Sequence, residues 1–173
     1  MSRIIVLVAL ALPFLGCAKK FADNIPEGCP SNNALTIQSK AATGVTVKQA
    51  WYASWGKNGA LAFASYDDFD PASFHKHEIA GTEALVVIKL SRADGAEVGK
   101  GRYESSSGRD PKPALQVNEF NLSTAGLAGG VFDKSGFVDV TYFGNDFVCG
   151  NIKADDGRSK IVGPFITKFK KAS

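Results

Sequence analysis

Residues 137–169 decide the fold class and read FVDVTYFGNDFVCGNIKADDGRSKIVGPFITKF. Three runs rich in Val, Ile, Phe and Tyr, at 137–143, 147–154 and 160–169, are separated by two short segments of Gly, Asn, Asp and Ser. β-Branched and aromatic residues favour strands, whereas Gly, Asn and Asp tolerate the backbone angles of tight turns. The stretch therefore predicts a C-terminal β-meander.

Alternation along the first of these runs predicts which side chains face the core. Val138, Val140 and Tyr142 fall on one side of an ideal strand, and Asp139 and Thr141 fall on the other. The apolar set is expected to be buried.

The same pattern extends upstream through short apolar runs that are cut by turn residues. An Asp94-Gly95 pair between two such runs predicts a β-hairpin. A single helix is expected near residues 70–78, with Asp70 as its cap. The further candidate strands are 35–39, 45–55, 60–66, 84–90, 97–103, 114–122 and 129–132. We expect a single all-β domain, either an antiparallel β-sandwich or a small barrel.

Length and composition fit one folded domain. The chain has 173 residues, 45% of them hydrophobic and 21% charged, with a formal net charge of +3. The charge is small and evenly spread, so no nucleic-acid partner is expected.

The first residues are typical of a signal peptide. Arg3 precedes an uncharged run from Ile4 to Leu15, which as a helix would reach only about 18 Å and cannot cross a hydrocarbon layer of about 30 Å. We assign residues 1–16 to the signal, 17–33 to the modified N-terminus and a tether, and 34–173 to the all-β domain.

The sequence Phe14-Leu15-Gly16-Cys17 resembles the lipobox of bacterial lipoproteins. The resemblance implies lipidation of Cys17, and Ala18 in the next position implies delivery to the outer membrane. The alternative is cleavage after Ala18 by ordinary signal peptidase, which would release a secreted or periplasmic soluble protein. The C-terminal meander also resembles the ending of secreted β-rich bacterial lipoproteins, without implying an activity.

Cys29 and Cys149 remain as an even pair once Cys17 is assigned to the anchor. In an oxidising compartment a disulfide between them is expected, although two free thiols are the alternative.

Two clusters could bind metal. Asp67, Asp68 and Asp70 offer hard oxygen ligands for Ca²⁺, although the EF-hand pattern is absent and a solvated loop is the alternative. His75 and His77 have a spacing compatible with Zn²⁺ or Cu²⁺ on a strand, and surface histidines are the alternative. We expect no obligatory cofactor.

Trp51 and Trp55 share one face of a strand candidate. On an exposed face they could stack on sugars or dock a partner; on an internal face, shared with Val45 and Val47, they would belong to the core.

No nucleophile-elbow motif is present, and we expect no enzymatic activity. The sequence favours a membrane-anchored envelope lipoprotein that acts as a protein-interaction or assembly module. The alternative is a carbohydrate- or calcium-binding surface module.

Overall fold

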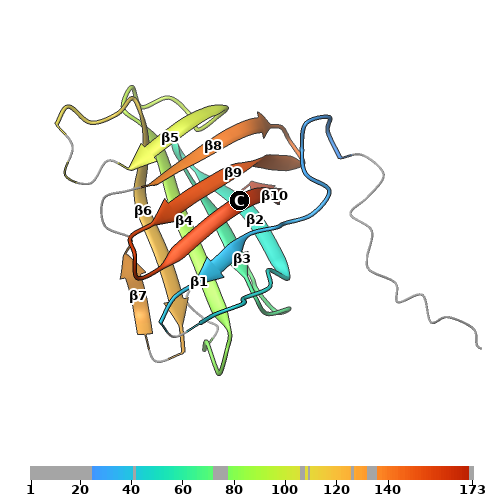
Figure 1. Ribbon diagram of the computed structural model, residues 1–173. Helices are drawn as coiled ribbons and strands as arrows, with labels where there is room; N and C mark the ends of the chain where they lie inside the picture. The colour runs from blue at the N-terminus through green and yellow to red at the C-terminus, as the bar shows by residue number, and fades with distance from the viewer. Residues whose placement is uncertain are drawn as a thin grey trace, which may run out of the picture.

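The computed structural model describes residues 25–40, 42–71, 78–105, 108, 110–125, 127–131 and 136–171 (Figure 1). These residues form strands and connecting segments, with no helix among them, which confirms the all-β prediction. The strands are β1 (Thr36–Gln38), β2 (Gln49–Trp55), β3 (Asn58–Ala64), β4 (Ala84–Arg92), β5 (Gly101–Ser105), β6 (Leu115–Thr124), β7 (Leu127–Val131), β8 (Gly136–Phe143), β9 (Phe147–Asp155) and β10 (Lys160–Lys171).

Eight of these strands hydrogen-bond in a closed ring. The order around the ring is β10-β2-β3-β4-β6-β5-β8-β9, and β9 pairs again with β10. In Figure 1, β8, β9 and β10 cross in front of β3, β4 and β6. The pairings are antiparallel except for β10 with β2 and β5 with β6, which are parallel. We call this ring the closed sheet.

The predicted C-terminal meander is present. β8 pairs with β9 and β9 pairs with β10, both antiparallel. The candidate strand 129–132 corresponds to β7, which pairs with β6 and lies outside the ring. Local turn chemistry therefore identified the β8-β9-β10 unit and missed the partner of β7.

The predicted hairpin at Asp94-Gly95 is wrong, although its turn forms. Gly95 has a positive φ of 67°, and its N–H donates to the Arg92 carbonyl at 3.1 Å. However, β4 pairs with β3 and β6, whereas β5 lies on the far side of β6. The chain leaves the sheet after β4 and crosses one end of it before β5 begins. We call residues 93–100 the crossover loop.

Two hydrophobic clusters lie on opposite sides of the strands. The main cluster fills the closed sheet and includes the fully buried Leu61, Tyr103 and Phe165. A smaller cluster covers the outside of β2, β3 and β4. In it, Tyr66 and Phe69, from the segment that follows β3, pack on three strand residues, which are Ala62 and Ala64 of β3 and Leu85 of β4. The interior holds the larger apolar side chains, as expected for an eight-stranded closed sheet.

The N-terminal segment seals one edge of β10. β1 pairs with residues 160–162 and β2 pairs with residues 168–171 of the same strand. Between them, Ala34 N–H donates to the Pro164 carbonyl at 3.2 Å, and Ile166 N–H donates to Asn33 Oδ1 at 2.9 Å. The strand edge is thus satisfied along the interval that no other strand covers.

The predicted disulfide is present. Cys29 and Cys149 are bonded, with their Cα atoms 5.7 Å apart and 120 residues between them in the sequence. Cys149 lies next to the inward-facing Val148 in β9, so alternation directs it to the outer face of the sheet. The bridge therefore fastens the start of the described chain to the outside of β9.

The last described residues, 168–171, belong to β10 and pair with Trp51–Ser54 of β2. The expected helix falls mainly on 72–77, outside the described residues. Within the part of the chain that is described, no helix has the length and apolar character needed to span a membrane.

Candidate functional site

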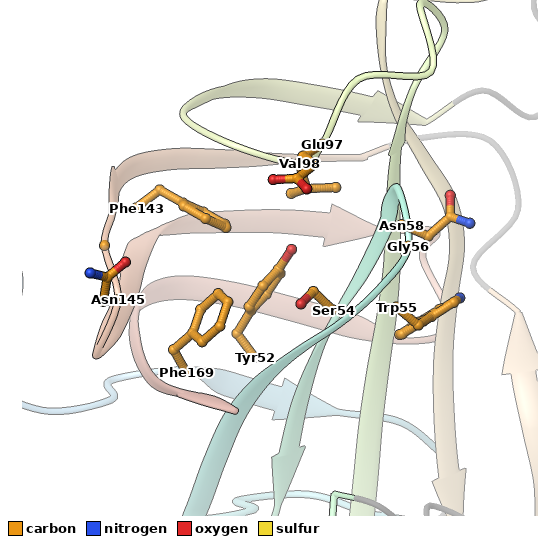
Figure 2. Close-up of a pocket in the computed structure, with 11 residues that line it drawn as sticks. Tyr52, Ser54, Trp55, Gly56, Asn58, Glu97, Val98, Phe143, Asn145 and Phe169 are labelled. Atoms are coloured by element: carbon orange, nitrogen blue, oxygen red, sulfur yellow. The ribbon is translucent and has the colours of Figure 1, made fainter. Parts of the chain in front are cut away.

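A pocket of about 690 Å³ opens at one end of the closed sheet (Figure 2). Its walls come from the β2–β3 turn, the crossover loop, the β8–β9 turn and the end of β10. Four aromatic side chains and four polar side chains contribute to the lining. They are Tyr52, Trp55, Phe143 and Phe169, and Ser54, Asn58, Glu97 and Asn145. We call this the mouth pocket.

Three aromatic rings pack together at the base of the mouth pocket. The ring centroid of Tyr52 lies 5.2 Å from those of Phe143 and Phe169, and the latter two are 5.9 Å apart. Two of the three pairs are edge-to-face, the geometry that the ring quadrupoles favour. Phe143 and Phe169 are half-buried, so their rings join the core on one side and the pocket on the other.

A β-bulge in β8 brings Phe143 into this cluster. Val140 pairs with Gly150, but Tyr142 pairs with Cys149, so Thr141 is an extra residue in the strand. Phe143 consequently faces inward beside Val148, and Tyr142 faces outward with Cys149. The predicted inward face is correct for Val138 and Val140 and wrong for Tyr142, because simple alternation does not include the extra residue.

Two backbone hydrogen bonds fix the β8–β9 turn against β10. Gly144 N–H donates to the Phe147 carbonyl at 2.9 Å, which closes the turn. Phe169 N–H donates to the Asp146 carbonyl at 2.9 Å, which holds the end of β10 beside it. Phe143 and Phe169, which are far apart in sequence, are thereby held in contact.

The crossover loop is anchored at both ends. Asp94 accepts a hydrogen bond from Ala96 N–H at 3.0 Å and pairs with the Arg92 guanidinium at 2.7 Å. The Arg92 hydrogen bond holds the pKa of the Asp94 carboxyl well below its usual range. At the other end, the Tyr103 hydroxyl bonds both the N–H and the carbonyl of Gly99 at 2.9 Å.

Between these anchors, Glu97 and Val98 lie over the pocket. Val98 is buried against the core, whereas Glu97 is exposed and lines the opening. Figure 2 shows the Tyr52 hydroxyl pointing toward these two residues. Burial, then the charges of Tyr103 and Glu97, raise the pKa of Tyr52 above its ordinary value. Tyr52 therefore remains a neutral hydroxyl at physiological pH.

The polar side chains of the mouth pocket have hydrogen-bonding groups that the described residues leave without partners. Among the described residues, none forms a hydrogen bond or ion pair with the side chains of Glu97, Asn58, Asn145 or the hydroxyl of Tyr52. An aromatic base with unpartnered polar groups around it is the usual composition of a small-molecule site.

The structure separates the two tryptophans that the sequence analysis singled out. Trp51 is half-buried in the outer cluster, with the Lys168 ammonium 5.8 Å from its ring centroid. Trp55, at 41% exposure, lies at the edge of the mouth pocket. Val45 and Val47 pack on the inner cluster instead, so the predicted core face shared with the tryptophans is wrong. β2 begins only at Gln49, and the alternation does not extend back to the valines.

The acidic loop does not gather into a metal centre in the described residues. Asp67 pairs with the Lys48 ammonium at 3.0 Å. No group of three His, Cys, Asp or Glu side chains in the described part of the chain is arranged to hold a metal ion, Asp68 and Asp70 included. His75, His77 and Cys17 lie outside the described residues.

The sequence analysis missed Glu97, Phe143, Phe169 and Asn145 as members of one site. No local motif joins them, because the crossover and the bulge bring them together. A scan against protein-family models found no match. Searches of curated proteins and of solved structures likewise found no match.

Proposed function

We propose that this chain is an envelope lipoprotein whose domain, a small barrel rather than a sandwich, binds a small organic ligand in the mouth pocket without transforming it. Acylated Cys17 would supply the membrane anchor, most simply at the outer membrane. Two or more acyl chains hold a protein stably on a bilayer, because each buried methylene contributes about 0.8 kcal/mol.

The mouth pocket is the observation that carries the binding function. Its volume of about 690 Å³ lies within the range of about 300–1,000 Å³ typical of small-molecule sites. The aromatic base offers apolar contact area, and the unpartnered side chains around it offer hydrogen bonds that orient a ligand.

Ligand binding is tested by NMR on the full chain in a non-ionic detergent. A library of small polar and aromatic fragments should shift the amide signals of Ser54, Glu97 and Asn145 together. Signals of Ser39, Thr43 and Gly157, around a shallower hollow lined by the β9–β10 turn, are the internal control. Shifts confined to the control residues, or absent from both sets, would refute the proposed function.

The anchor is tested separately by mass spectrometry of the mature N-terminus. Acylated Cys17 is the expected product, and Cys17→Ser should abolish both lipidation and membrane sedimentation. An unmodified N-terminus beyond Cys17 would instead support the soluble alternative.

Trp55 favours a second candidate, the protein-interaction module. It is the one large hydrophobic side chain that is exposed among the described residues, and exposed tryptophans often anchor partners. A photo-crosslinker at position 55 should then capture an envelope protein in intact cells, and Trp55→Ala should release it. Undiminished capture with the crosslinker at Glu78 would show that the contact is unspecific.

A further inference from the structure

We propose that the ligand of the mouth pocket is a small organic cation that carries an ammonium group. The inference rests on the proposed function of this pocket and adds the charge of the ligand. It comes from the charges and the ring geometry around the opening.

Glu97 carries the one formal charge among the described residues that line the pocket. Its carboxylate is exposed and has no ion-pair partner in the described residues. Asp94, three residues earlier on the same loop, has its guanidinium partner 2.7 Å away. In the described part of the chain, the opening therefore presents a carboxylate that no ion pair compensates.

Two basic side chains close to the crossover loop are directed away from Glu97. The Lys57 ammonium lies beside Gly95, 3.4 Å from the position that a Cβ atom would occupy at this glycine. The Lys100 ammonium lies 5.6 Å from the ring centroid of Tyr142, on the outer side of β8. Neither lysine is among the described residues that line the mouth pocket, and neither forms an ion pair with Glu97.

The aromatic residues of the mouth pocket also favour a cationic ligand. Ring faces carry negative electrostatic potential, which attracts an ammonium group within about 6 Å of a ring centroid. Figure 2 shows Phe143, Phe169 and Tyr52 on one side of the view and Glu97 above them. A cation between them would meet the carboxylate and the rings together. An anion would be repelled, and a neutral sugar could donate hydrogen bonds to the carboxylate but would bring no counter-charge.

The Tyr52 hydroxyl and the amide of Asn145 complete the arrangement. A hydroxyl and an amide oxygen accept hydrogen bonds from ammonium N–H groups or from a ligand hydroxyl. Because burial raises the pKa of Tyr52, this group adds no competing charge. The chemistry therefore fits choline-like and other short amine ligands.

Isothermal titration of the full chain in a non-ionic detergent tests the charge preference. The probes are choline, its neutral isostere 3,3-dimethyl-1-butanol, and glucose. Choline should bind saturably and at least about tenfold more tightly than the isostere. Equal affinity for choline and the isostere, or binding of glucose alone, would overturn the cation inference and leave the proposed function standing. Absence of binding by every probe and every fragment would overturn both.

A matched pair of variants assigns the effect to one carboxylate. Glu97→Gln should weaken the binding of choline about tenfold and leave the affinity for the isostere unchanged. Glu78→Gln removes the same charge from an exposed residue on the segment before β4, at the opposite end of the sheet, and should change neither affinity. An equal loss in both variants would show only a general electrostatic attraction and would contradict the assignment. Glycerophosphocholine, used as a further probe, distinguishes two sources of the cation. Tight binding of glycerophosphocholine indicates a lipid headgroup, whereas binding of choline in preference to glycerophosphocholine indicates a free solute.

Discussion

Tyr52 occupies the mouth pocket because Gly59 leaves room for it. A side chain at Gly59 would overlap the Tyr52 hydroxyl and come within 2.6 Å of the ring carbon that bears it. Gly59→Ala is therefore expected to displace the ring and to destabilise the protein by about 1–3 kcal/mol, the usual cost of overpacking. Urea unfolding measures this loss.

Gly99→Ala is the matched control for that substitution, because nothing lies within 4 Å of the added atom. It should change stability by less than about 0.5 kcal/mol. In a Tyr52→Leu background the cost of Gly59→Ala should shrink. A Gly59→Ala variant as stable as the parent protein would contradict the packing described for Tyr52.

We expect the folded protein to lose stability in alkali, because it contains buried tyrosines. Burial raises the pKa of Tyr66 from 10.0 to about 12, with Asp68 and Glu83 adding to the shift. The pKa values of Tyr52 and Tyr103 are also raised, mainly by burial. A raised pKa in the folded state means that the stabilisation is complete below pH 10 and is lost as pH rises toward 12. The urea midpoint should fall over this interval.

Tyr66→Phe isolates one contribution to that fall. The phenylalanine variant cannot ionise at this position, so its midpoint should fall less steeply between pH 10 and 12 than that of the parent protein. Identical slopes in the two proteins would show that Tyr66 ionises normally in the folded state.

Strand positions were predictable from sequence to within a few residues, because turn residues separate runs of strand-forming residues. Side-chain direction was predictable only where alternation is uninterrupted, as for Val138 and Val140. The extra residue Thr141 reverses the side-chain direction of the residues after it, so Phe143 could not be assigned to the pocket. A bulge depends on the register of two strands, which one strand alone does not reveal.

The hydrogen bond between Asn33 and β10 can be tested at a single amide. Ile166 is fully buried, and its N–H donates to Asn33 Oδ1 at 2.9 Å. Asn33→Ala leaves that amide without its acceptor, at an expected cost of about 1–3 kcal/mol. Hydrogen exchange at Ile166 should accelerate accordingly. Asn32→Ala, at an exposed neighbour, should leave exchange unchanged, and an equal acceleration in both variants would contradict the role of Asn33.

The closed sheet as a whole depends on contacts between distant parts of the chain. β10 joins both β9 and β2, and β5 inserts between β6 and β8. The pairings of β10 with β2 and of β5 with β6 could not be inferred from hairpin signals, because these report only neighbours in sequence. The mouth pocket combines residues from 52 to 169, and was therefore beyond the reach of local motifs. The cysteine pair was an exception, since two remaining thiols in an oxidising compartment allow one bridge.

That bridge joins the start of the described chain to β9 and should stabilise the whole fold. It spans 120 residues, for which the chain-entropy model gives about 4–5 kcal/mol, since cross-linking restricts the unfolded chain most when the loop is long. We expect the Cys29→Ala, Cys149→Ala double variant to lose about 3–5 kcal/mol in urea unfolding followed by tryptophan fluorescence. A reductant should lower the midpoint of the parent protein and leave that of the double variant unchanged. If both proteins unfold at the same urea concentration without reductant, the bridge does not stabilise this fold, and the hydrogen bonds of residues 33–38 along β10 suffice to hold the segment in place.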